Sequence, residues 1–313
     1  MLWFDLIITT LIFIIVLMVL CGVFSLCERK VMALVQLRVG PGLFFFGILT
    51  PITDGLKLFV KFILFVISFD ILYFIFALYI TAICMYFIWF FVPLGYIVFL
   101  DINFSILLLI AIHMINNVFS IFLIGCFLFT SCFIYLAAMR ALFFSIITEG
   151  AFSVSLYNFY ILDFFSFFSI KNIAINQIFI QNIFLVGLIF FFIFVIIILL
   201  DGMRIPFDYL ECESELVAGI ITEFSGFFFV LYSLMEINHL LLSSLLIVAM
   251  CFGGVYMTLK SLFVVLVVFL FPRVLGCRLK ITTAQTFVLV FLFSMSFILF
   301  LWTAITKILT LIN

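Results

Sequence analysis

The sequence predicts an all-α integral membrane protein that crosses the bilayer about eight times. Of its 313 residues, 70% are apolar and only 9% are charged, whereas a soluble domain is about half apolar and a quarter charged. The mean hydropathy is +1.61. This number of charged side chains is too small to cover the surface of a soluble fold. The surroundings of the chain must therefore be apolar. The net charge of −1 shows none of the excess positive charge that nucleic-acid-binding proteins carry.

Eight apolar runs are each long enough to cross a bilayer, which takes about 20 residues of helix. We place the spans of this single polytopic domain (residues 1–313) at about 4–27, 71–93, 104–127, 141–161, 180–200, 217–240, 245–271 and 286–306. Most Lys and Arg residues fall in the first, third, fifth and seventh loops. This bias predicts an even number of spans, with both termini facing away from the compartment in which the chain is made.

The first loop, residues 28–61, is long and charged, and we expect it to lie along the membrane surface. A Gly-Pro-Gly turn signal occupies residues 40–42, and Thr50 can cap a helix that begins at the proline after it. Apolar residues separate the charges, as in an amphipathic interfacial segment. A positive-inside anchor explains the basic residues. The acids Glu28 and Asp54 among them favour a partner surface or an anionic or polar ligand.

Carboxylates mark the second half of the chain. The acidic fifth loop, residues 201–217, contains Asp201, Asp208, Glu211, Glu213 and Glu215. A solvated loop would account for these, but Glu149, Glu223 and Glu236 lie within apolar sequence. A charge at membrane depth costs roughly 2.5–3.5 kcal/mol on insertion scales, so such residues favour a path for protons or cations. Glu223 and Glu236 would be about 20 Å apart along a helix, so a relay between them needs water and further carboxylates such as Glu149, or a helix break near Ser225 and Gly226.

A redox or hydrolytic centre is not predicted in this polypeptide. The eight cysteines are scattered without a Cys-x-x-Cys pair, which argues against a zinc site, an iron–sulfur cluster or a disulfide framework. His113 and His239 lie in apolar spans, and facing histidines can ligate haem. Because the chain has no second pair of histidines, we interpret His113 and His239 as hydrogen-bonded structural residues. We also find no phosphate loop, dinucleotide turn or nucleophile elbow.

Two gapped motifs occur in order along the chain. The first contains Glu28, Arg29, Lys30, Gln36, Arg38, Gly40, Pro41, Asp54, Gly55, Lys57 and Lys61. The second contains Arg204, Pro206, Phe207, Asp208, Glu211, Glu213, Ser214, Glu215, Glu223, Phe224, Ser225, Gly226 and Glu236. Together they resemble the signatures of the subunit 1 family of NADH:ubiquinone oxidoreductase, respiratory complex I. Departures from the family pattern, such as Asp201 in place of Glu and Met203 in place of Asn, point to a divergent lineage.

The resemblance implies a core membrane-arm subunit of the proton-pumping enzyme, as a multi-pass protein of the mitochondrial inner membrane. It would form the access tunnel for the substrate ubiquinone and the start of a carboxylate path that couples quinone reduction to proton translocation. The quinone path would comprise Glu28, Arg29, Arg38, Asp54, Lys57, Arg204 and Phe207. The proton-coupling residues would be Glu149, Asp201, Asp208, Glu211, Glu213, Glu215, Glu223 and Glu236.

The same resemblance implies that this chain is enzymatic only as a subunit and binds no metal or covalent cofactor. NADH, FMN and the iron–sulfur clusters would belong to partner subunits. Its partners would be the quinone-site subunits of the peripheral arm, neighbouring membrane-arm subunits and lipid, without nucleic acid.

Three other interpretations stay open at this point. A free-standing ion channel or secondary transporter would explain the intramembrane acids but not the long charged interfacial loop. A plastid NADH-like complex or an energy-converting hydrogenase would keep the family but change the complex. The abundance of Phe, 50 residues of 313, favours a mitochondrial origin instead. A haem-bearing membrane cytochrome would give the purified protein a Soret band.

Overall fold

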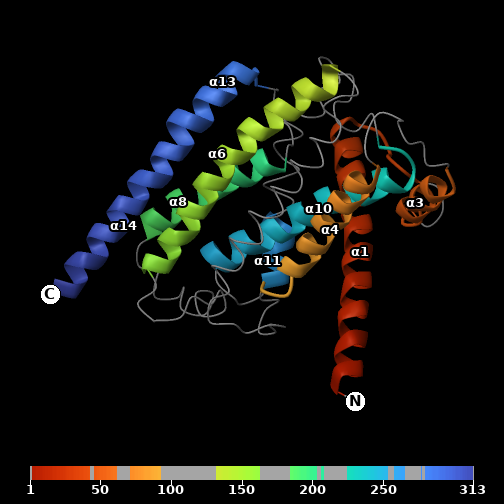
Figure 1. Ribbon diagram of the computed structural model, residues 1–313, viewed down its shortest axis with the longest axis horizontal. Coiled ribbons are helices and arrows are strands. Elements are labelled where there is room, and N and C mark those ends of the chain that lie inside the picture. The colour runs from red at the N-terminus through yellow and green to blue at the C-terminus, as the bar shows by residue number, and fades with distance from the viewer. Residues whose placement is uncertain are drawn as a thin grey trace.

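The fold is described by a computed structural model, which places residues 2–42, 46–61, 71–92, 132–162, 184–202, 206–207, 224–252, 257–264, 276 and 279–312 (Figure 1). All regular secondary structure in these residues is helical. In chain order the elements are α1 (Leu2–Val35), α3 (Thr50–Val60), α4 (Ile71–Ile88), α6 (Cys132–Leu162), α8 (Phe184–Asp201), α10 (Phe227–Ile247), the π-helix η3 (Val248–Phe252), α11 (Met257–Val264), α13 (Ile281–Thr286), the π-helix η5 (Phe287–Phe293) and α14 (Ser294–Ile312).

Several of these helices are long and apolar enough to cross a membrane. Among the described residues, four stretches meet this criterion: Ile8–Val35, Tyr135–Asn158, Phe227–Ile247 and Ile281–Ile308. Two shorter apolar helices, Ile75–Ile88 and Ile189–Leu200, coincide with two further predicted spans. The predicted span at 104–127 lies outside the described residues. The structure therefore supports an all-helical membrane protein, while the total of eight spans stays a prediction.

The central element is α10, which contacts α1, α3, α4, α8 and α11. Apolar residues cover most of its circumference, as expected for a helix that other helices surround. The predicted boundary between the sixth and seventh spans, at residues 241–244, is wrong. These residues lie inside α10, which continues through η3 to Phe252, because residues 241–252 include no Pro, Gly or charge that would end a helix.

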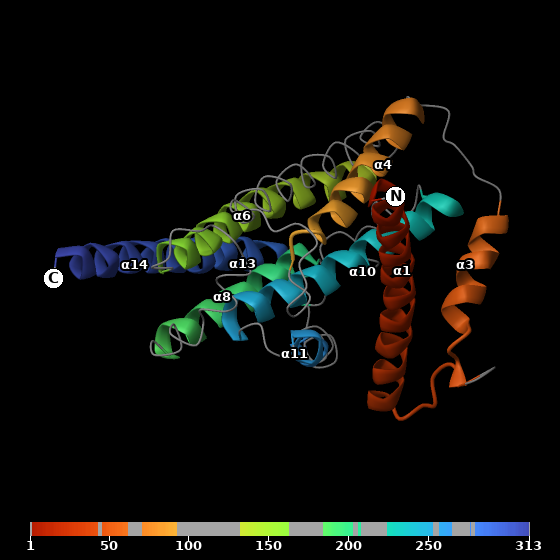
Figure 2. The ribbon, with the colours of Figure 1, turned by 90° about the horizontal axis from the view of Figure 1, so that it is seen from below.

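A second group of helices packs beside this centre. The elements α13, η5 and α14 follow one another as a single long rod, which runs alongside α6 in both views (Figures 1 and 2). The helix α6 also packs on α8. The buried faces form a core of aliphatic and aromatic side chains that reaches from α1 to η5.

Buried polar pairs join these helices. The Trp89 indole N–H donates to Asn238 Oδ1 of α10 at 2.9 Å, and the Thr303 hydroxyl donates to Asn158 Oδ1 at 2.9 Å. Hydrogen bonds between helices of this kind are typical of membrane proteins, where lipid offers polar groups no alternative partner. The bonds therefore fix the pairing of the end of α4 with α10 and of α6 with α14.

Lys260 is a charge within the predicted seventh span. It lies in the short helix α11, and its ammonium group donates to the carbonyl oxygen of Phe252 at 2.7 Å. Phe252 is the last residue of η3, where carbonyl groups lack partners within the helix. The charge thus caps the end of the helix that runs on from α10.

Candidate functional site

The helix α1 runs further than the sequence predicts. The predicted loop at residues 28–61 begins later, because residues 28–35 continue α1 and the charged Glu28–Lys30 segment is helical. Glu, Arg and Lys are good helix formers, and a cluster of charges does not by itself end a helix. The consequence is that the charges lie on a rigid element that projects beyond the apolar part of the span.

The end of α1 is a Schellman motif built without glycine. The N–H of Leu37 donates to the carbonyl of Leu34 at 3.1 Å, and the N–H of Arg38 donates to that of Ala33 at 2.9 Å. Leu37 has φ +55, the left-handed conformation that this motif requires at the residue after the cap. The reversal of direction brings Arg38 back against the last turns of α1.

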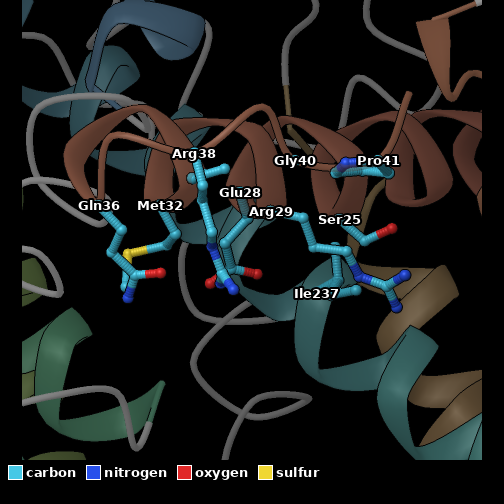
Figure 3. A pocket seen from close by; sticks show the side chains of 10 residues that line it. Ser25, Glu28, Arg29, Met32, Gln36, Arg38, Gly40, Pro41 and Ile237 are labelled. Carbon is cyan, nitrogen blue, oxygen red and sulfur yellow. The ribbon is translucent and has the colours of Figure 1, made fainter.

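A cavity of about 700 Å³ lies at this end of α1. Its lining residues are Ser25, Glu28, Arg29, Met32, Ala33, Gln36, Arg38, Gly40, Pro41 and Ile237. Figure 3 shows the side chains of Glu28, Arg29 and Arg38 extending to the same side of α1, toward the helix that carries Ile237. Three of the residues predicted for the quinone path are thus brought together, and α10 contributes an apolar wall.

Asp54 joins this site from α3, the helix beside α1 in Figure 2. Its Oδ2 lies 2.7 Å from Nη1 of Arg29, and the side chains of Arg29 and Asp54 are 57% and 49% exposed. Lys57, on the next turn of α3, is exposed and does not line the cavity. The ion pair therefore connects α3 to the cavity wall through the Arg29 guanidinium.

The predicted amphipathic helix is present, with a shifted start. The helix α3 begins at Thr50 with Leu49 as its N-cap, and the Thr50 hydroxyl donates to the carbonyl of Gly47 at 2.7 Å. The prediction that Thr50 itself caps the helix is wrong by one residue. None of the residues of α3 is buried, and Leu56, Phe59 and Val60 are more than half exposed, as expected for a helix with one face in lipid.

The predicted turn at residues 40–42 is confirmed, and Gly47 lies close against it. Gly40 has φ +61 and Gly47 has φ +86, backbone conformations that glycine adopts at low cost. A Cβ at Gly47 would lie 2.5 Å from the carbonyl oxygen of Pro41. Only glycine fits there, so the turn that delivers Pro41 to the cavity is sterically specified.

Two of the predicted proton-coupling residues have side chains that the structure describes. Glu149 of α6 is 6% exposed and lies among apolar side chains of the main core. Glu236 is half-buried on α10, next to the cavity-lining Ile237. The two carboxylates are therefore carried by separate helices, one deep in the core and one half-buried at the position before a cavity residue.

Phe207 does not belong to the cavity wall. It is 5% exposed, and its ring is stacked on that of Phe287, with centroids 6.4 Å apart and planes at 22°. Of the other predicted site residues, these lie outside the described part of the chain: Arg204, Asp208, Glu211, Glu213, Glu215 and Glu223. Asp201 is the last residue of α8, but its side chain also lies outside the described part.

The residues of this arrangement suit binding of a polar group next to an apolar body rather than a metal ion. Within the described ranges, no three His, Cys, Asp or Glu side chains gather closely enough to hold a metal. The cavity offers guanidinium donors, which bind carbonyl or anionic oxygens, beside Met32 and Ile237.

Comparison with known proteins identifies the family. The family model described as NADH dehydrogenase matches residues 8–304. NADH-ubiquinone oxidoreductase chain 1 of Leishmania tarentolae is 54% identical over 312 residues, which cover 100% of both chains. The chain belongs to the family of NADH:ubiquinone oxidoreductase subunit 1. Members of this family are subunits of an oxidoreductase, and the resemblance predicted from the sequence is confirmed.

More distant members of the family retain the similarity over most of the chain. NADH-ubiquinone oxidoreductase chain 1 of Chondrus crispus is 35% identical over 76% of this chain and 72% of its own length. An NADH-quinone oxidoreductase subunit of Ruthia magnifica is 32% identical over 80% of this chain and 73% of its own. These relatives are all named for oxidation of NADH by a quinone.

Seven of the residues that line the cavity were not predicted as site residues from the sequence: Ser25, Met32, Gln36, Ala33, Gly40, Pro41 and Ile237. The signal for the first three is helical spacing, because residues 25, 28, 29 and 32 share one face of α1 and residue 36 continues that spacing directly after the helix ends at Val35. Ile237 has no comparable signal, since it comes from a helix far away in the sequence and is one apolar residue among many.

Proposed function

We propose that this chain forms the membrane-side access path for ubiquinone, and the first part of a carboxylate path for protons, in complex I of the mitochondrial inner membrane. Membership of the subunit 1 family supports the assembly, and the names of the relatives supply the substrate class. The observation that carries the residue-level proposal is the cavity lined by Glu28, Arg29 and Arg38.

The cavity combines the two kinds of surface that a quinone needs. The headgroup has two carbonyl oxygens that accept hydrogen bonds, and Arg38 and Arg29 provide guanidinium donors. The isoprenoid tail is apolar, and Met32, Pro41 and Ile237 provide apolar walls. The amphipathic α3, whose apolar stripe is exposed, lies against α1 beside this cavity, so the site opens close to the membrane surface from which a quinone enters.

The charged turn after α1 also supports a protein partner at this end. Leu37 is 96% exposed and Val39 is 91% exposed, on either side of the cavity residue Arg38. Exposed apolar side chains beside charges are typical of protein interfaces. We assign this face to the quinone-site subunits of the peripheral arm, which would hold the nearest iron–sulfur cluster, with FMN and NADH further away in that arm.

The buried carboxylates support the proton path. A carboxylate inside a membrane helix is costly and is by default functional, and Glu149 is nearly fully buried in α6. Glu236 lies beside a cavity residue on the central helix. Asp201, Asp208, Glu211, Glu213, Glu215 and Glu223 complete the proposed path on the evidence of sequence alone.

The direct test is an Arg38→Met variant, compared with Lys30→Met as a control. Lys30 is a neighbouring cation that does not line the cavity, and its ammonium lies 5.9 Å from the centroid of the Phe46 ring. Loss of a charged hydrogen bond, about 1.5–3 kcal/mol, predicts that the KM for a short-chain quinone rises about tenfold or more in Arg38→Met. Equal KM values for the two variants and wild type would contradict the proposed role.

A native gel separates this proposal from a free-standing channel or transporter. Gently solubilised membranes are stained for NADH-driven dye reduction and probed for this chain. Comigration with the large NADH-oxidising complex is expected. A small band without that activity would contradict the proposed function as a whole.

A further inference from the structure

The turn between α1 and α3 contains backbone conformations that are rare for residues with a side chain. Within the described part of the chain, the non-glycine residues with positive φ are Leu37 at φ +55 and Phe46 at φ +57, and both belong to this turn. A non-glycine residue in the left-handed region costs about 1–3 kcal/mol, and such residues cluster at functional sites. The same turn contributes Arg38, Gly40 and Pro41 to the cavity wall. The strained positions therefore adjoin the site proposed for quinone.

The side chain of Leu37 does not account for the conformation of its backbone. It is 96% exposed, so it packs against almost nothing in this chain. The backbone N–H groups are what the turn uses: that of Leu37 donates to the carbonyl of Leu34, and the next one along donates to the carbonyl of Ala33. Both bonds require a left-handed residue after the cap. Within this chain, position 37 therefore matters through its backbone conformation rather than through its side chain.

The reversal at Leu37 decides where Arg38 lies. In a helix that simply continued, Arg38 would follow Arg29 by nine residues, which is about 13.5 Å further along the axis and about 180° around it. Instead both residues line the same cavity, and Figure 3 shows their side chains extending to the same side of α1. The returning chain lies close against α1, because a Cβ at Gly40 would be 3.0 Å from the Cβ of Ala33. The left-handed residue at position 37 is thus what brings Arg38 into the cavity.

We propose that Leu37 is a positioning residue of the quinone site, whose left-handed backbone conformation keeps the Arg38 guanidinium at the cavity wall. It acts through Arg38 rather than on the substrate. The apparent affinity for a ligand falls with the share of molecules in the binding-competent conformation. A residue at position 37 that disfavours the left-handed backbone therefore raises the KM for quinone. This inference rests on the proposed function, because it takes Arg38 as a quinone-binding residue.

The test uses the whole complex in membranes and measures NADH:quinone reductase activity over a range of concentrations of a short-chain quinone. Leu37→Val introduces a β-branched side chain, which strongly disfavours the left-handed region, whereas Leu37→Gly and Leu37→Asn introduce residues that adopt it readily. Leu34→Val is the matched control, because Leu34 is also exposed, at 72%, but lies within the helix α1. We expect the KM of Leu37→Val to rise about threefold or more with kcat unchanged, and the KM values of the other three variants to stay within about twofold of wild type.

Equal KM values for Leu37→Val and Leu34→Val would overturn the proposal. An equal rise in KM for Leu37→Gly, Leu37→Asn and Leu37→Val would overturn it too, because the site would then need the leucine side chain and not the backbone conformation. Failure of Leu37→Val to assemble, on a native gel where Leu34→Val assembles, would show a purely structural turn and would have the same consequence. Arg38→Met separates these results from failure of the proposed function. Its KM rises if only this inference is wrong, and equals that of wild type if the quinone path itself is wrong.

Discussion

Replacing Asp54 with Asn tests whether α3 orients a cavity residue. The carboxylate lies 2.7 Å from the Arg29 guanidinium, and both side chains are about half exposed. Exposed ion pairs contribute about 0.2–1 kcal/mol, and Asn keeps the shape of the side chain and one acceptor oxygen. Assembly should therefore be unaffected. Because the guanidinium would be held less firmly at the cavity wall, the KM for quinone should rise by up to about fivefold, with kcat unchanged.

The assay is NADH:quinone reductase activity in membranes, measured over a range of concentrations of a short-chain quinone. Native gels establish that variant and wild-type complexes are present in equal amounts. High ionic strength screens exposed pairs, so the difference between Asp54→Asn and wild type should narrow as salt is raised. Asp54→Glu retains the charge and should recover most of the wild-type KM.

An unchanged KM for Asp54→Asn at low salt would refute this reasoning. A fall in kcat without a change in KM would refute it as well, because an orienting contact at the cavity wall acts on binding. Loss of the assembled complex would mean that the pair contributes far more to structure than its exposure allows.

Three further predictions concern the turn, the helix pairing and the buried acid. Gly47→Ala places a Cβ within 2.5 Å of a backbone carbonyl oxygen at φ +86. The substitution should destabilise the turn by roughly 1–3 kcal/mol, which would be measured as faster protease cleavage there. Gly55→Ala, where a methyl group meets no atom within 4 Å, is the control, and equal cleavage of the two variants would contradict the steric argument. Asn238→Leu leaves the buried indole N–H of Trp89 without its acceptor and should lower the stability of the complex by about 1–2 kcal/mol, measured by thermal unfolding, whereas an unchanged melting temperature would count against it. Glu149→Gln should assemble and reduce quinone but translocate fewer protons per NADH, and normal translocation would exclude this carboxylate from the path.

The sequence is most informative where composition and local signals act alone. The lack of charge predicts a membrane protein with helices, and the Gly-Pro-Gly segment and the Thr-Pro pair predict the turn and the interfacial helix to within one residue. Helix boundaries are predicted less well. The charges at Glu28–Lys30 suggested the end of a span, although nothing in those residues opposes a helix. The helix ends at Val35 instead, and the motif that ends it uses a left-handed leucine, Leu37, that has no sequence signature.

Long-range packing could not be predicted. Nothing in the sequence around Ile237 indicates that it faces the end of α1, because an apolar residue in an apolar helix gives no directional signal. The stacking of Phe207 on Phe287 is equally invisible in a chain with 50 phenylalanines. Sequence reasoning placed Phe207 with the quinone-path residues, whereas the structure places its ring in the core.

The most direct test of the central claim is photolabelling with a short-chain ubiquinone analogue that carries a photoreactive group, in intact membranes, with the labelled peptides mapped. The proposed function predicts labels within residues 25–41 and near Ile237, reduced by excess ubiquinone and reduced in Arg38→Met but not in Lys30→Met. Label confined to partner subunits, or to the lipid-exposed face of α14, would contradict a quinone path along the end of α1.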